Sequence, residues 1–175
     1  MNLLSRISPL LALLLLIGCA HTPPAAQAPA APATLAPAGG GFAVDMPGTP
    51  KQTPAANGNH VFASEVNGVA YIVSYADVPP QVQVNPKNMQ GLLDATRESI
   101  VNNGHAEVVA EKQTTLDGEP ARELHLKTKE GYFMRLKIGF LGSRLYQVGA
   151  VTSQEHAAAP EIARFIDSFR FTARK

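Results

Sequence analysis

The chain has 175 residues, a single cysteine, and 15 basic against 14 acidic side chains. One cysteine excludes disulfides within the chain and zinc sites built from several cysteines. The near balance of charge argues against nucleic-acid binding, which usually comes with a clear basic excess.

The N-terminal segment resembles the leader of a bacterial lipoprotein. An arginine precedes a leucine-rich run that is shorter than the roughly 20 apolar residues needed to span a bilayer as a helix. The residues Leu16-Ile17-Gly18-Cys19 resemble a lipobox. This resemblance implies a signal peptide at 1–18 and lipidation of Cys19 by palmitate-type acyl chains. Two or more chains give a stable membrane anchor, whereas one chain binds only reversibly. An ordinary secretory leader is the alternative.

Residues 19–41 are predicted to form a tether. They are almost wholly alanine, proline and glycine, with no charged side chain. Proline favours polyproline II at about 3.1 Å per residue, so the segment is expected to act as a semi-rigid spacer. Loss of 1–18 removes one arginine, which leaves 14 basic and 14 acidic side chains and a formally neutral protein. Residues 42–175 have the length of a single globular domain.

The domain begins with three predicted strands. Phe42, Val44 and Met46 alternate before a proline-rich and glycine-rich loop. The alternating runs 61–66 and 69–76 are separated by Asn-Gly, the strongest short hairpin signal, because both central residues of a type I′ turn need positive φ.

A helix is predicted next. Asn85-Pro86 is typical of an N-cap followed by proline at the first helical position. Gly104 is expected in the left-handed position at its C-terminal end. The apolar stripe between them recurs at spacings of three and four, through Met89, Leu92, Leu93, Thr96 and Ile100.

Four further strands are predicted to form an antiparallel meander, over 107–115, 121–128, 132–141 and 145–151. Asp-Gly and Gly-Ser turns connect them. A second helix opens at Pro160, and a short extended tail, 170–172, ends the domain. The predicted order is β-β-β-α-β-β-β-β-α. Strands and helices in this order favour an α+β fold in which a mainly antiparallel sheet is flanked by helices.

Four short motifs suggest a family. The first is an opening strand that ends in proline, Phe42 to Pro47, and the second is a central turn, Leu116 to Ala121. The third is a late strand, Arg144 to Tyr146, and the fourth is a closing helix, Arg164 to Phe169. Together they resemble the PsbP-like fold family, which includes bacterial lipoproteins of the DcrB type. The resemblance implies an α/β/α sandwich and an accessory or binding role rather than catalysis.

No catalytic or cofactor motif is recognisable. The sequence lacks the G-x-S-x-G, G-x-G-x-x-G and G-x-x-x-x-G-K-[ST] patterns. The charges between Asp117 and His125 are interpreted as a solvated sheet face. The histidines are scattered, so neither a metal site nor a cofactor is expected. They are His21, His60, His105, His125 and His156.

One weak ligand site is predicted in the meander. Arg135 and Lys137 lie two residues apart in one strand, so their side chains point the same way. Lys127 and Arg144 are expected on neighbouring strands. Such a face would suit an anionic headgroup, a glycan or a peptide carboxylate. Alternatively, the face is solvated or covered by a helix, and acidic side chains such as Glu123 neutralise it.

The combined expectation is a noncatalytic binding or assembly module, not an enzyme. It is held at the bacterial cell envelope by acylated Cys19, faces the periplasm, and binds an envelope protein or a small anionic ligand. An exposed groove or apolar patch is expected. Ala20 stands where enteric lipoproteins retained in the inner membrane carry aspartate, which favours the outer membrane. The alternative is an envelope hydrolase whose paired titratable groups meet in a pocket only on folding.

Overall fold

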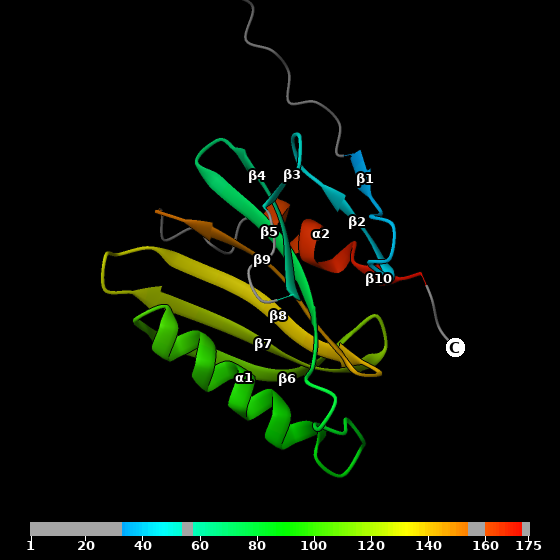
Figure 1. The fold of residues 1–175 in the computed structure, drawn as a ribbon. Coiled ribbons are helices and arrows are strands. Elements are labelled where there is room, and N and C mark those ends of the chain that lie inside the picture. The colour runs from blue at the N-terminus through cyan, green and yellow to red at the C-terminus, as the bar shows by residue number, and fades with distance from the viewer. Residues whose placement is uncertain (1–32, 54–57, 154–159, 173–175) are drawn as a thin grey trace, which may run out of the picture.

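Within residues 33–53, 58–153 and 160–172, which the computed structural model describes, the chain forms ten strands and two helices (Figure 1). They are β1 (Ala33–Leu35), β2 (Phe42–Met46), β3 (Lys51–Thr53), β4 (Asn59–Val66), β5 (Val69–Asp77), α1 (Met89–Asn103), β6 (Ala106–Leu116), β7 (Glu119–Thr128), β8 (Phe133–Leu141), β9 (Arg144–Thr152), α2 (Pro160–Asp167) and β10 (Arg170–Phe171). Seven strands form the main sheet in the order β3-β4-β5-β9-β8-β7-β6, and a small sheet has the order β1-β2-β10. All pairings are antiparallel.

Tight turns of the predicted types connect the hairpins. Asn67 and Gly68 have φ of 53° and 75°, and Asp117 and Gly118 have φ of 47° and 91°. Positive φ at both central residues is what a type I′ turn requires, and Asn-Gly and Asp-Gly tolerate it best. Gly142 has φ of 58°, as the first central residue of a type II′ turn does. Local sequence therefore determines how neighbouring strands pair.

Strand β9 joins the N-terminal hairpin to the C-terminal meander. It pairs with β8 through the predicted turn, and its other edge pairs with β5, so that Tyr75 lies opposite Tyr146. These two strands are far apart in sequence. Their contact makes one continuous sheet from the two halves of the domain.

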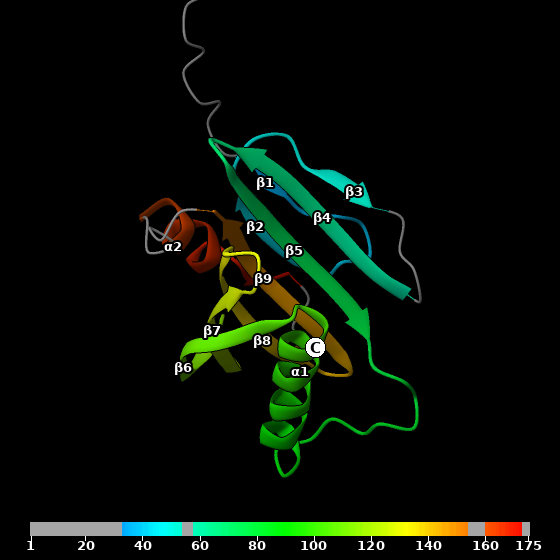
Figure 2. The same ribbon diagram turned by 90° about the vertical axis from the view of Figure 1, so that its left-hand side faces the viewer.

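The two faces of the main sheet pack against different helices, as Figure 2 shows. On what we call the α1 face, Leu93 of α1 packs among Leu124, Leu136 and Ile138. On the opposite α2 face, aromatic and aliphatic side chains of the sheet pack against α2 and the small sheet. This is the predicted arrangement of a mainly antiparallel sheet flanked by helices.

Two short strands, β1 and β3, are additional to the predicted elements, and β10 lies in the predicted extended tail 170–172. Strands β1 and β10 pair with the two edges of β2, and β3 pairs with β4. Such pairing uses backbone groups, so the side-chain pattern does not reveal it; all three residues of β3 are exposed. Strand β1 lies within the predicted tether 19–41, so the chain joins the domain before residue 42. The predicted signal peptide 1–18 and Cys19 lie outside the described residues.

The ends of the first helix differ from the prediction. Helix α1 begins at Met89, because Asn85 forms a turn in which its side-chain oxygen accepts from the Lys87 amide at 3.0 Å. At the other end Gly104 has a right-handed φ of −83°, and His105 takes the left-handed conformation with φ of 45°. The Gly104 amide still donates to the Ile100 carbonyl at 2.9 Å.

Candidate functional site

The predicted cations Arg135 and Lys137 lie together on the α2 face of β8, each beside an acidic group. The Nε of Arg135 donates to Glu123 Oε1 at 2.8 Å, and Lys137 Nζ donates to Asp167 Oδ1 of α2 at 2.8 Å. Their side chains are 16% and 12% exposed. The anion-binding role of this pair stays a prediction, and the two cations belong to separate ion pairs.

Glu123 is the centre of a charged cluster on the α2 face. Its side chain is only 2% exposed, so interpreting this stretch as a solvated face was wrong for this residue. His125 Nε2 lies 3.2 Å from Oε1, and Lys112 Nζ lies 3.2 Å from Oε2. Burial alone would raise the pKa of Glu123, but hydrogen bonds from His125 and Lys112 and the nearby Arg135 outweigh it and hold the pKa at about 2. The carboxylate is therefore charged at neutral pH.

A second charged network ties α1 to the meander on the opposite face. The buried guanidinium of Arg122 donates to Asp94, to Glu111 at 2.8 Å and to Gln90 at 3.1 Å. Arg97 donates to the other oxygen of Glu111 at 3.0 Å. Two arginines thus face two carboxylates. These contacts fix α1 over β6 and β7, which is a structural role.

Arg144, which was expected near Arg135, lies at the far end of the sheet and holds the N-terminal segment. It donates to both carboxylate oxygens of Asp77, at 2.6 and 3.1 Å, and to the Gly39 carbonyl at 2.7 Å. Its guanidinium lies 4.8 Å from the Tyr75 ring centroid. The hydrogen bond from Arg144 is the main cause that lowers the pKa of Asp77. This contact determines where the chain enters the domain.

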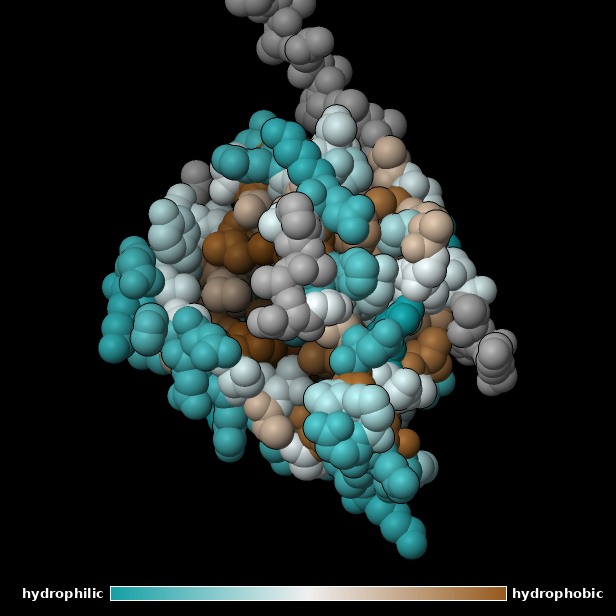
Figure 3. Space-filling view, viewed as in Figure 1, coloured by the Kyte–Doolittle hydropathy of each residue, from teal (hydrophilic) through white to brown (hydrophobic). Residues whose placement is uncertain are grey.

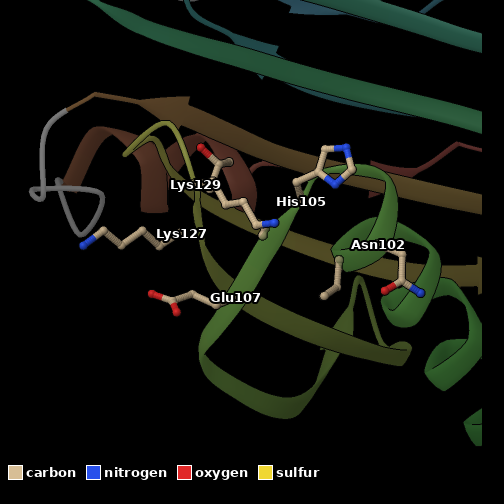
Figure 4. Close-up of a pocket in the computed structure, with 8 residues that line it drawn as sticks. Asn102, His105, Glu107, Lys127 and Lys129 are labelled. Carbon is tan, nitrogen blue, oxygen red and sulfur yellow. The ribbon is translucent and has the colours of Figure 1, made fainter.

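A polar hollow of about 480 Å³ lies at the C-terminal end of α1 (Figure 4). Figure 4 shows that the amino groups of Lys127 and Lys129 point in different directions. No hydrogen bond joins two titratable side chains of this described pocket, so it lacks the paired groups that the hydrolase alternative needs. The pocket is lined by Val101, Asn102, His105, Ala106, Glu107, Lys127, Thr128 and Lys129.

An apolar trough runs over the part of the α1 face that α1 leaves uncovered. Helix α1 packs mainly against β6, β7 and β8, at one side of the sheet. Figure 3 shows the exposed floor as a hollow of hydrophobic residues above α1 and beside β4 and β5. The cavity in it measures about 140 Å³. It is lined by Ile72, Ser74, Met134, Leu136, Gln147, Val148, Gly149, Ala150 and Val151.

Small side chains keep the trough open. Gly149 faces Leu136 across the strands, and a Cβ at Gly149 would come within 2.5 Å of the Leu136 Cβ. Helical geometry places Leu92, Thr96 and Ser99 on the flank of α1 opposite the one that contacts Arg122. The trough is thus lined mainly by apolar residues of β5, β8 and β9 and by no charged side chain, which suits an apolar partner.

The histidines of the described region lie apart. His60 stacks on Tyr75 with ring centroids 4.5 Å apart, His125 belongs to the Glu123 cluster, and His105 lies in a turn. No group of three or more metal-ligating side chains occurs among the described residues. His21 and His156 lie outside them. None of the helices in the described ranges is long and apolar enough to cross a membrane.

Comparison with known proteins shows the fold. No protein-family model and no curated protein matches the chain. The solution structure of cyanobacterial PsbP (CyanoP) from Synechocystis sp. PCC 6803 is similar, with a TM-score of 0.61 and 11% identity over 83% of this chain and 95% of that chain. A mutant of the protein Mog1 is similar with a TM-score of 0.53 and 11% identity, over 80% of this chain and 95% of that one. The chain therefore has a PsbP-like α+β fold.

An exposed groove or apolar patch was expected, but neither the position of the trough nor the burial of Glu123 was predicted. Both depend on which strands meet. A signal for the trough was present, because small residues such as Ala70, Ser74 and Gly149 alternate with larger ones in the strands that line it. For Glu123 the period of two placed it on one face with Ala121, which is also buried. That pattern indicates an inward-facing position rather than a solvated one.

Proposed function

We propose that this chain, with its PsbP-like fold, is a lipid-anchored envelope protein of the DcrB type and that its domain is a noncatalytic binding or assembly module. The apolar trough is the observation that carries the binding role. The lipobox-like sequence that ends at Cys19 supports the anchor, and Ala20 favours the outer membrane. Residues 19–32, before β1, would separate the domain from the lipid surface.

The trough supports binding because its apolar floor is left in water. An exposed apolar surface in a hollow gains free energy when a partner removes it from water, at about 25 cal/mol per Å². No charged side chain lines the trough, so an apolar segment of an envelope protein would not have to desolvate an ion there. Noncatalytic binding of a partner at this face is the function that this geometry supports best.

A charge placed in the trough is expected to abolish partner capture. Ile72→Lys puts an ammonium group on the apolar floor, and burying it costs a few kcal/mol, which corresponds to at least about a tenfold loss of crosslinked partner. The measurement is a crosslinking pull-down from membranes that carry the full-length protein.

The control for this experiment is Gln113→Lys, which adds the same charge on the exposed edge strand β6. It is expected to leave the yield of crosslinked partner unchanged. Equal yields from Ile72→Lys and the unchanged protein, with both folded by circular dichroism, would rule out the trough as the binding site.

Replacing Cys19 by serine is expected to remove the anchor. Serine lacks the thiol that accepts the lipid, so incorporation of labelled palmitate should fall to background and the protein should leave the membrane fraction. The intact mass of the unchanged mature protein should show acyl chains and no residues 1–18. An unmodified sulfur, or a retained leader, would contradict this proposal.

A further inference from the structure

We propose that Arg135, Lys112 and His125 form a binding site for a phosphate group on the α2 face, opposite the trough. This inference deepens the proposed binding role by naming a ligand chemistry. It rests on the proposed function in one respect, namely that the domain binds a ligand and does not catalyse a reaction.

The Glu123 cluster carries an excess of positive charge, because Arg135 and Lys112 share a single carboxylate. Glu123 is the one carboxylate that Arg135, Lys112 and His125 share, and they come from three adjacent strands. Among ion pairs between described residues, the other groups balance cation against anion. They are Arg97 and Arg122 with Asp94 and Glu111, Lys137 with Asp167, Arg144 with Asp77, Arg164 with Glu161, and Arg170 with Asp45. The Glu123 cluster alone would gain from a second anion.

Arg135 is oriented so that its Nε side faces Glu123. Its Nε is used by Glu123, and in the described part of the chain neither Nη1 nor Nη2 has a hydrogen-bond partner. These two nitrogens form the edge of a guanidinium that binds an oxyanion through two parallel hydrogen bonds. The buried carboxylate holds the guanidinium in place, so little side-chain entropy is left to lose on binding. Arg135 is thus positioned as a binding group.

The outer side chains of the Glu123 cluster are accessible to solvent. Lys112 and His125 are 62% and 41% exposed, while the carboxylate between them is buried. A ligand therefore meets the side chains of Lys112 and His125 before it meets Glu123. Lys127 adds positive charge farther along the same face, over the Phe133 ring at 5.4 Å, and Glu107 lies opposite it in the strand pairing. The site is distinct from the predicted Arg135 and Lys137 pair, because Asp167 already holds Lys137.

The number of donors favours phosphate over carboxylate. A guanidinium edge, an ammonium and an imidazole on three strands match a tetrahedral group with several acceptor oxygens and up to two negative charges. A carboxylate carries only one negative charge, so it would offset less of the positive charge of Arg135 and Lys112 than a phosphate group does. The phosphate belongs either to a soluble ligand or to a lipid headgroup.

The test titrates inorganic phosphate into the full-length Cys19→Ser chain at pH 7 and constant ionic strength. The readout is the set of backbone amide resonances of β6, β7 and β8, which the unchanged protein and every variant share. We expect saturable binding, at least about tenfold weaker in Arg135→Lys, which keeps the charge but loses the two-pronged edge, and in Lys112→Gln. Arg164→Gln, a control that removes an exposed arginine of α2, should bind as the unchanged protein does. No saturation, equal affinity for acetate, or unaltered affinity in both variants would overturn the proposal.

Vesicles identify the source of the phosphate. Binding to phosphatidylglycerol vesicles but not to phosphatidylcholine vesicles, lost in Lys112→Gln, supports a lipid headgroup; phosphate binding without selective vesicle binding supports a soluble ligand. Arg135→Lys should leave crosslinking at the trough unchanged. Failure of this site is therefore separable from failure of the proposed partner capture.

Discussion

The Glu123→Gln variant is expected to lose about 3 kcal/mol of folding stability at pH 7, and to lose no more than a small part of that at pH 2. The folded-state pKa of Glu123 is about 2 against its usual 4.5. A difference of about 2.5 units corresponds to about 3 kcal/mol. Glutamine keeps the shape of the side chain but leaves Arg135 and Lys112 without their shared anion.

The direction of the pH dependence follows from the lowered pKa. Because folding favours the charged carboxylate, its stabilising contribution is fully present above about pH 5 and is lost as the pH falls through 2. Urea unfolding of the full-length Cys19→Ser chain, followed by circular dichroism between pH 2 and pH 7, measures it. The two unfolding curves should converge toward acid pH.

The matched control is Glu161→Gln. Glu161 is more than half exposed and pairs with Arg164 one turn away on α2, at 3.1 Å. Such a surface pair contributes only about 0.3 to 0.5 kcal/mol. The control should therefore keep the pH dependence of the unchanged protein. Parallel curves for Glu123→Gln and the unchanged protein across the whole pH range would show that the cluster does not stabilise the fold.

The Phe42→Ala variant is expected to lose about 4 kcal/mol, because it removes a fully buried ring from a core that cannot close around the gap. Phe42 is 1% exposed. Its ring stacks on Phe169 with centroids 5.4 Å apart, and it meets Tyr75 and Tyr146 edge to face at 6.0 and 6.2 Å. Strand β2, which carries this ring, has β1 on one edge and β10 on the other.

Loss of the Phe42 ring should also loosen the small sheet. Thermal unfolding measures the stability, and hydrogen exchange of the amides of β1 and β10 should become faster than that of β7 and β8. Tyr132→Ala is the control, since Tyr132 is an exposed aromatic and its removal should cost less than about 0.5 kcal/mol. Uniform loss of protection over all strands would contradict a separable role for the small sheet.

The two faces of the sheet offer different chemistry to a partner. The α1 face has the uncharged trough, and the α2 face has the Glu123 cluster with its outward cations. Both lie where a helix stops short of covering the sheet. The proposed binding role therefore depends on the incomplete helical cover of a PsbP-like domain rather than on a motif in the chain.

Local sequence determined the strands, the helices and their turns. Asn67-Gly68 and Asp117-Gly118 adopt positive φ because these residue pairs tolerate it better than others, and this depends only on near neighbours. Alternation with a period of two likewise predicted that Tyr71 and Tyr75 share a buried face. These features are local, so the amino-acid order is sufficient to indicate them.

Only the tertiary structure decided which segments lie side by side. The pairing of β5 with β9, the addition of β1 to β2, and the meeting of Lys112, Glu123 and Arg135 all join residues that are distant along the chain. Pairing at strand edges uses backbone groups, so it is hard to recognise from the pattern of side chains. The charges around a glutamate depend on neighbours from other strands. The trough and the proposed phosphate site are both made of residues from several strands of the sheet. Their burial and charge depend on contacts between these strands, which the order of residues along the chain does not reveal.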